Sequence, residues 1–246
     1  MAMSQLEVDK KNPILRKDRS STGILDLDIL LEGGYAKNSS IMLLGPTGME
    51  KNAFSFHFAD AGIKNKEKVL YLTSDSTPED LLKKADSVGF DFRPAFSSGD
   101  LTFIDCYSAT LGSKPVSAEN VMMLDGPSSL NDLSVGIKEL MESSSGKSIR
   151  LIFHSLSTFI LYNPPDSILK FLQVVEGRAR NAGATTLFLV EEGMHEKKLL
   201  ASVEHLMDEK YIIHDGGNFA LESIKLPMNV PLRLSQSGVE IGDLDG

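Results

Sequence analysis

The sequence predicts an α/β fold, in which a doubly wound, mostly parallel β-sheet is flanked by helices and ends in a C-terminal antiparallel hairpin. Short apolar runs alternate with helical stretches along most of the 246 residues, which is typical of a sheet buried on both faces. A glycine-rich turn follows the first of these runs. Near the C-terminus, Asp215-Gly216-Gly217 separates the strand-like segments 209–214 and 218–224, and such a turn favours a hairpin.

Five apolar runs are expected to form the parallel strands. Each is short, rich in aliphatic and β-branched residues, and bounded by polar residues or glycine. The runs are 40–45, 68–74, 101–106, 149–155 and 185–191. A further run at 231–241 is expected to add one edge strand.

Helices are expected between these strands. The clearest start signal is at Thr77, which can cap a helix whose first turn holds Pro78, Glu79 and Asp80, because proline suits the first turn and acids favour the positive end of the helix. The expected helices are 22–31, 51–63, 77–88, 130–143, 165–181 and 196–207. Alternation of this kind predicts right-handed crossovers within one domain. The connection 107–129 is long, and loops of that length are usually functional or mobile.

Composition limits the classes of function. The formal net charge of −9 disfavours a chain whose whole surface binds nucleic acid, since DNA affinity depends on neutralising phosphates. The lone Cys106 excludes an intramolecular disulfide, and no Cys/His grouping has zinc spacing. No apolar run approaches the length of a membrane span, and the N-terminus lacks a signal-peptide pattern. We therefore expect a cytoplasmic protein without membrane attachment.

The two ends of the chain are expected to lie outside the domain. Residues 1–19 are polar and basic, residues 20–235 form the domain, and residues 236–246 form a frayed acidic tail with Glu240, Asp243 and Asp245. The basic cluster at the N-terminus is either a solvated segment or an arm that contacts nucleic acid or a partner. Its members are Lys10, Lys11, Arg16, Lys17 and Arg19.

The turn after the first strand has the position of a phosphate-binding loop. The pattern G-x-x-x-x-G-K-[ST] between a strand and a helix holds phosphates through backbone N–H groups, while its Lys contacts phosphate and its hydroxyl holds magnesium. The corresponding residues are Gly45, Pro46, Thr47, Gly48, Met49, Glu50, Lys51 and Asn52. Glu50 replaces the second glycine and Asn52 replaces the Ser/Thr. Taken alone, the segment fits a degenerate phosphate loop or an ordinary strand–helix turn equally well.

Two further segments favour the phosphate loop. The lead-in Ser21-Thr22-Gly23-Ile24-Leu25-Asp26-Leu27-Asp28-Ile29-Leu30-Leu31-Glu32-Gly33-Gly34 comes first, and Thr77-Pro78-Glu79-Asp80-Leu81 follows the second strand. Together with the loop they resemble the KaiC- and RadA-like branch of the RecA-type P-loop ATPases over residues 20–226. That branch typically shows S-T-G-I-x-x-L-D-x-L-L-x-G-G, then G-P-P-G-T-G-K-T, then S-P-E-D-L. The resemblance implies a RecA-like sheet.

The resemblance also shows where this chain departs from the family. The family's catalytic glutamates align with Asp75 and Ser76, its Walker B aspartate with His154, and its magnesium-binding hydroxyl with Asn52. Neither the catalytic set nor the magnesium set is therefore intact. In the loop, a Glu50 carboxylate about 5 Å from a phosphate would repel it by roughly 3 kcal/mol at an effective dielectric near 20. We predict negligible ATP hydrolysis and no required cofactor, with weak ATP or ADP binding left open and magnesium disfavoured.

Three functions remain as hypotheses. The first is a regulatory or assembly subunit that acts through a protein partner or a homo-oligomer. The second is a nucleotide sensor that binds ATP or ADP without turnover. The third is a DNA-binding recombination accessory, which the net charge disfavours. His154 would either contact a nucleotide or fill the vacated magnesium position, and His57 is expected to be a packed core residue.

Overall fold

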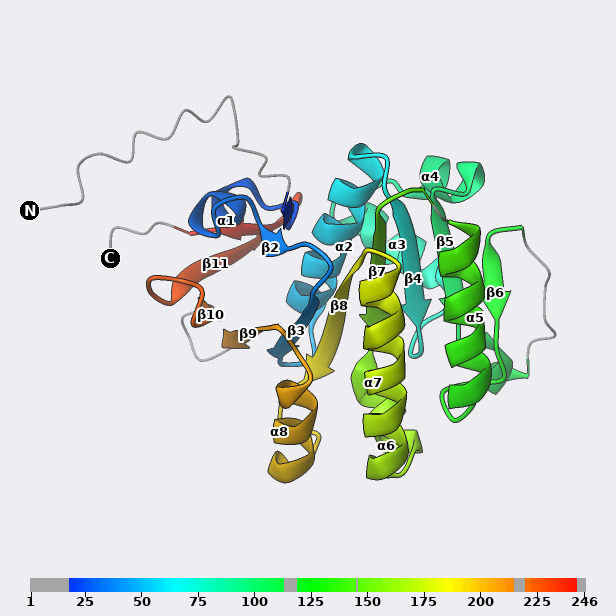
Figure 1. The fold of residues 1–246 in the computed structure, drawn as a ribbon. Helices are drawn as coiled ribbons and strands as arrows, with labels where there is room; N and C mark the ends of the chain where they lie inside the picture. The colour runs from blue at the N-terminus through cyan, green and yellow to red at the C-terminus, as the bar shows by residue number, and fades with distance from the viewer. Residues whose placement is uncertain (1–17, 113–118, 145, 215–219, 243–246) are drawn as a thin grey trace, which may run out of the picture.

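A ten-stranded sheet runs through the molecule, with helices on both of its faces (Figure 1). The computed structural model describes residues 18–112, 119–144, 146–214 and 220–242. Seven neighbouring strands are parallel, and the last three strands of the chain extend the sheet with antiparallel pairing. From edge to edge the strands are β12 (Gly238–Ile241), β11 (Val230–Ser235), β10 (Ala220–Glu222), β9 (Glu209–His214), β3 (Ser40–Gly45), β8 (Ala184–Glu191), β7 (Ile149–His154), β4 (Lys68–Thr73), β5 (Leu101–Asp105) and β6 (Val121–Met123).

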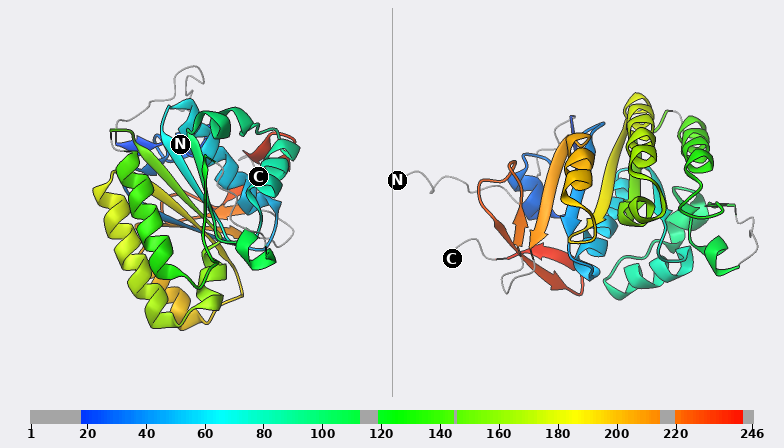
Figure 2. Two further views of the ribbon diagram at one scale, coloured as in Figure 1. Left: turned by 90° about the vertical axis from the view of Figure 1, so that its right-hand side faces the viewer. Right: turned by 90° about the horizontal axis from the view of Figure 1, so that it is seen from below.

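The helices form two layers, one on each side of the sheet (Figure 2). One layer consists of α1 (Leu25–Leu30), α2 (Met49–Lys64), α3 (Pro78–Ser87) and α4 (Arg93–Ser98). The other consists of α5 (Leu130–Ser143), α6 (Leu156–Tyr162), α7 (Pro165–Asn181) and α8 (Lys197–His205). A separate two-stranded ribbon pairs β1 (Arg19–Ser20) with β2 (Tyr35–Ala36).

Two apolar cores separate these layers from the sheet. Successive strand side chains point to opposite faces, so Ile41 and Leu43 of β3 join the core under α2, while Met42 and Leu44 join the core under α7. All six residues of β3 are buried. The near-continuous apolar runs of the sequence therefore correspond to strands covered on both sides, and the predicted fold class is confirmed.

Several predicted element bounds agree with the structure. The strand 40–45 and the helices 130–143 and 165–181 match β3, α5 and α7. Thr77 caps α3 as expected, because its hydroxyl accepts a hydrogen bond of 3.1 Å from the backbone N–H of Asp80. The hairpin of β9 and β10 is also present, although its tip at 215–219 lies outside the described residues.

The C-terminal end differs from expectation. The run 231–241 forms two strands, β11 and β12, because Gly238 takes a positive φ of 95° and reverses the chain. Glu240 lies in β12, where it accepts hydrogen bonds from Arg233 at 2.8 Å and Ser235 at 2.7 Å. The expected acidic tail is thus part of the sheet as far as Ile241, and the boundary at 235 is too early. Asp243 and Asp245 lie outside the described residues.

The long connection 107–129 contains regular structure rather than only loop. A short 3₁₀ helix occupies Ser108–Leu111, and β6 pairs in parallel with β5 through Phe103 and Val121. Residues 113–118 and most of the basic N-terminal cluster lie outside the described residues, but Arg19 belongs to β1. None of the helices in the described ranges is long and apolar enough to cross a membrane.

Candidate functional site

The lead-in segment is a scaffold for the loop that follows it. The Asp28 carboxylate accepts hydrogen bonds from the Ser21 hydroxyl at 2.5 Å, the Thr22 N–H at 2.7 Å and the Thr22 hydroxyl at 2.7 Å. Gly23 has a φ of 87°, and a Cβ there would lie 2.2 Å from the carbonyl oxygen of His57. Only glycine lets the chain approach α2 so closely. These signature residues therefore fix the position of α2 and carry no chemistry of their own.

His57 is packed, as predicted, and joins the two ends of the domain. Its Nδ1 lies 3.2 Å from the Gly23 carbonyl oxygen, and its Nε2 accepts a hydrogen bond of 3.0 Å from the Val239 N–H. The ring contacts Phe90 edge to face at a centroid distance of 4.8 Å. Burial lowers the pKa of His57, which keeps the ring neutral and able to accept from Val239.

A buried arginine holds the same scaffold from the sheet side. Arg150, the second residue of β7, has a fully buried side chain that pairs with Glu67. Its Nη1 donates to the carbonyl oxygens of Ser21 at 2.6 Å and Phe58 at 2.9 Å. The guanidinium also lies over the Phe58 ring, 4.4 Å from its centroid. One side chain thus connects the lead-in, α2 and the sheet.

The phosphate loop lies at the carboxyl edge of the parallel strands, where ligands bind in open α/β sheets. It leaves β3 at Gly45 and enters α2 at Met49. Pro46 and Gly48 are half-buried and Thr47 is exposed. The side chains of Met49 and Glu50 lie outside the described residues, so the predicted effect of the Glu50 carboxylate stays a prediction.

Lys51 is paired within the protein. Its side chain is 2% exposed, and its Nζ lies 2.9 Å from Glu191 Oε1, 3.3 Å from the Gly45 carbonyl oxygen and 3.4 Å from the Val190 carbonyl oxygen. Glu191 ends β8, and its Oε2 accepts a hydrogen bond of 2.7 Å from the Ser155 hydroxyl. Burial alone raises the pKa of Glu191, but Lys51 and the hydroxyls of Ser157 and Ser155 outweigh burial and lower it. The pair is therefore an ammonium and a carboxylate.

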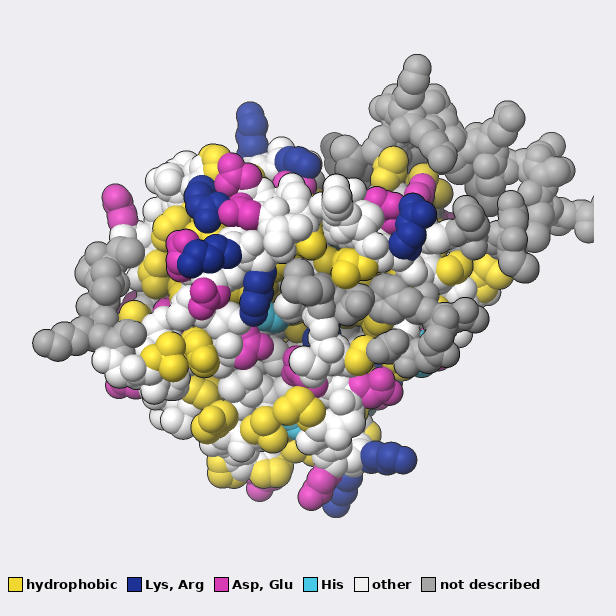
Figure 3. Space-filling view, turned by 180° about the vertical axis from the view of Figure 1, so that it is seen from behind, with side chains coloured by type: hydrophobic (Ala, Val, Ile, Leu, Met, Phe, Trp, Pro, Cys, Tyr) yellow, Lys and Arg dark blue, Asp and Glu magenta, His cyan; other side chains and the backbone are white. Residues whose placement is uncertain are grey.

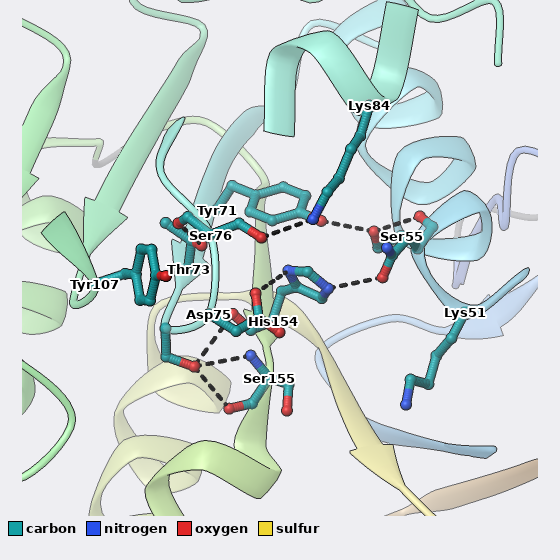
Figure 4. A network of polar contacts seen from close by, with 12 residues as sticks. Lys51, Ser55, Tyr71, Thr73, Asp75, Ser76, Lys84, Tyr107, His154 and Ser155 are labelled. Atoms are coloured by element: carbon teal, nitrogen blue, oxygen red, sulfur yellow. Dashed lines mark hydrogen bonds and ion pairs between the residues drawn. The ribbon is translucent and has the colours of Figure 1, made fainter. Parts of the chain in front are cut away.

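The three positions that the resemblance assigns to magnesium and water chemistry contact one another. His154 Nε2 lies 2.7 Å from Asn52 Oδ1, and His154 Nδ1 lies 3.5 Å from Asp75 Oδ1. Because an amide oxygen can only accept, Nε2 carries the proton of this hydrogen bond. Burial lowers the pKa of His154 more than the neighbouring carboxylates raise it, so the imidazole is neutral. Figure 4 shows the ring between helix α2 and the end of β4.

Ser76, the other residue at a catalytic position, is also engaged. Its hydroxyl accepts a hydrogen bond of 2.8 Å from Lys84 Nζ, and its carbonyl oxygen accepts one of 2.5 Å from the Thr73 hydroxyl. Lys84 extends from α3 toward this group of polar side chains (Figure 4). Asp75 is the most exposed of the set, with 41% of its side chain accessible.

These residues do not fit a magnesium-bound nucleotide. Magnesium requires oxygen ligands in near-octahedral geometry, yet the position of the Walker B aspartate holds an imidazole whose Nε2 is bonded to Asn52. Among the described residues, no group of three or more His, Cys, Asp or Glu side chains could hold a metal ion. The loop cation is likewise bonded to Glu191. The arrangement is a polar network at the carboxyl edge, in which the buried His154 Nδ1 has no hydrogen-bond partner among the described residues.

The sequence placed four of these side chains at one edge but did not identify their partners. Lys51, Asn52, Asp75 and His154 all lie there, as parallel topology requires. Glu191 was missed, although it is the last residue of a predicted strand and therefore ends at the same edge. Arg150 was also missed, although a charged residue inside an apolar run is itself a signal.

Comparisons with known proteins identify the family to which the chain belongs. The family described as "ATPase: KaiC" matches residues 20–215, which is most of the chain. A UPF0273 protein of Methanopyrus kandleri is 23% identical over 192 residues, covering 78% of this chain and 74% of that protein. A UPF0273 protein of Pyrococcus horikoshii is 26% identical over 195 residues, covering 77% and 75%. The circadian clock oscillator protein KaiC of Prochlorococcus marinus is 25% identical over 225 residues, covering 81% of this chain but only 43% of that protein.

Proposed function

We propose that this chain, which belongs to the KaiC family of ATPases, does not hydrolyse ATP and acts through contacts with a protein partner or with further copies of itself. One observation carries the proposal. The side chains at the family's chemical positions bond to each other or to neighbouring residues: Lys51 to Glu191, and Asn52 to His154. None of these groups is arranged to receive a phosphate, a metal ion or an attacking water.

The chemistry of phosphoryl transfer is why this arrangement supports the proposal. Catalysis in P-loop enzymes rests on positioning and on neutralising the charge of the phosphates, with little covalent work for the protein. Here the loop ammonium is already neutralised by a carboxylate at 2.9 Å. The residue that would orient magnesium is a neutral imidazole. The cation that would neutralise the phosphates and the residue that would orient magnesium are therefore both bonded to other protein groups.

The surface supports a role in protein contacts over nucleic-acid binding. On the face shown in Figure 3, Lys and Arg side chains lie among Asp and Glu side chains and do not gather into one basic field. Large apolar side chains are exposed at the end of α6, where Leu161 is 57% and Tyr162 is 65% exposed, and after β10, where Ile224 is 97% exposed. Leu161 and Tyr162 are neighbours in the chain, and contiguous exposed apolar groups are typical of protein interfaces.

A phosphate-release assay tests the loss of hydrolysis. Purified protein with ATP and magnesium is compared with the Lys51→Ala variant, and both are expected to release phosphate at the rate of the buffer alone. Turnover by the natural protein that disappears in Lys51→Ala contradicts the proposal, because it would place the chemistry at this loop.

Three further measurements separate the alternatives. Calorimetry with ATP, with and without magnesium, detects a nucleotide sensor, which the proposal expects only at weak affinity. Light scattering over a range of protein concentrations reports self-assembly. Fluorescence anisotropy with single-stranded DNA is expected to show no salt-sensitive binding, and a steep salt dependence would instead favour the recombination accessory.

A further inference from the structure

We infer that Glu191 is an internal anion that occupies Lys51 in the place of a phosphate and thereby sets the affinity of the loop for nucleotides. The inference rests on the proposed function, because it concerns the same site, but it makes a separate claim. The proposed function says that the site does not turn ATP over. The inference says which residue keeps phosphate away.

The N–H donors of Lys51 are all used within the protein. An ammonium has three N–H donors and no acceptor. Three oxygens lie within 3.4 Å of Nζ: Glu191 Oε1 and the carbonyl oxygens of Gly45 and Val190. The side chain is 2% exposed. No donor of Lys51 therefore remains for an incoming phosphate unless one of these bonds is broken.

The carboxylate and the backbone of Glu191 are each held by a serine hydroxyl. Glu191 Oε2 accepts from the Ser155 hydroxyl at 2.7 Å, and the Glu191 N–H donates to the Ser157 hydroxyl at 2.8 Å. Ser157 in turn lies 2.7 Å from His195 Nε2. Glu191 is thus held at Lys51 by two serines at the start of α6, Ser155 through the carboxylate and Ser157 through the backbone, and its side chain is only 12% exposed.

A phosphate must then displace Glu191 or lie beside it. Displacement breaks a charge-assisted hydrogen bond and leaves a partly buried carboxylate without its cation. Lying beside it places two anions on one cation. Replacing Glu191 by glutamine removes the charge while nearly preserving shape and hydrogen-bonding capacity. The change should therefore release Lys51 without opening a cavity.

The test uses calorimetry with ADP in the absence of magnesium, on the full chain. Glu191→Gln is expected to bind ADP about tenfold or more tightly than the natural protein. The matched control is Glu192→Gln, which removes the adjacent, exposed carboxylate and should change nothing. Adding Lys51→Met to Glu191→Gln should abolish the gain, because the effect is transmitted through the ammonium.

Two further variants guard against misfolding of Glu191→Gln and against masking by Glu50. Ser155→Ala removes one support of the carboxylate with little change in volume, and it should give a smaller gain in the same direction if Glu191→Gln does not fold. The series is repeated with Glu50→Gly, so that repulsion by that second carboxylate does not mask the gain. Thermal melting confirms that each variant is folded.

The outcomes distinguish the two claims. If folded Glu191→Gln and Ser155→Ala bind ADP no better than the natural protein in both backgrounds, or if Glu192→Gln gives the same gain, the inference is overturned. If the natural protein already binds ADP as tightly as Glu191→Gln, it is overturned as well. Turnover of ATP by the natural protein in the phosphate-release assay overturns the proposed function instead. The role of Glu191 is then still decided by the ratio of the ADP affinities of Glu191→Gln and the natural protein.

Discussion

Replacing Arg150 by methionine should greatly reduce the stability of this fold. The side chain is fully buried near the start of β7, in a strand that is apolar from Leu151 to Phe153. Methionine has a similar length and no charge, so it fills the same space without any of the polar contacts. The variant should therefore lose stability because the ion pair and the hydrogen bonds are missing, with little change in packing volume.

The size of the expected loss of stability follows from the groups that would lose Arg150 as their partner. The Glu67 carboxylate, whose side chain is only 12% exposed, loses its cation. The carbonyl oxygens of Ser21 and Phe58 lose donors at 2.6 and 2.9 Å, and the Phe58 ring loses its cation. Removing one partner of a buried ion pair costs about 3–5 kcal/mol, against a total stability of about 5–15 kcal/mol. We expect a loss of about 4 kcal/mol, or about 10 °C in Tm.

Urea unfolding monitored by circular dichroism measures this loss. Arg93→Met is the control, since Arg93 forms a comparable pair with Asp86 at the surface, where 46% of its side chain is accessible, and should leave the midpoint unchanged. Arg150→Lys should not rescue stability, because the single nitrogen of an ammonium cannot occupy both the Nε and the Nη1 positions from which the guanidinium donates. A loss below about 1 kcal/mol for Arg150→Met, within the range of an exposed pair, would refute this account.

Other predictions follow from single positions. Gly23→Ala should lower Tm strongly, since its Cβ would lie 2.2 Å from the His57 carbonyl oxygen, whereas Gly177→Ala within α7, where a Cβ meets nothing within 4 Å, should stabilise by about 0.5–1 kcal/mol. Burial and the nearby Asp208 raise the pKa of Glu176 to about 7. Protonated Glu176 therefore stabilises the folded state. This stabilisation is complete below the pKa of the unfolded chain and is lost as the pH rises through about 7. Glu176→Gln should remove about 2 kcal/mol of that pH dependence, after allowance for solvent screening, and urea midpoints from pH 5 to 8 check it; an unchanged slope would contradict the assignment.

The sequence was sufficient for the elements that have strong local signals. The strands of the parallel sheet are nearly continuous apolar runs, and α3 has a cap, a proline and acids within four positions. The helix α6 was missed because it begins directly after β7 without a linker, so the two form one apolar stretch in the sequence. The strand β6 has only three residues and is defined by its pairing with β5, which no local pattern encodes.

In the site, the sequence was sufficient for the position of the side chains but not for their bonding partners. Parallel topology alone brings Asn52, Asp75 and His154 to one edge, because each follows or ends a strand. Which atoms bond there depends on distances across the sheet. Lys51 and Glu191 are 140 positions apart, and the loop pattern gave no reason to prefer that carboxylate over Glu50. Partner choice of this kind is set by register between β3 and β8, where Gly45 lies opposite Glu191.

The residues that match the family and those that depart from it differ in physical role. Asp28 and Gly23 match: Asp28 holds the lead-in together through Ser21 and Thr22, and Gly23 allows the lead-in to approach α2. Asn52 and His154 depart, and they bond to each other. A lone reversion of His154 to aspartate would leave Asn52 without its present partner and place a second carboxylate beside Asp75, where like charges oppose each other. Asn52 and His154 therefore depend on each other, and a change at either position is expected to disturb the other.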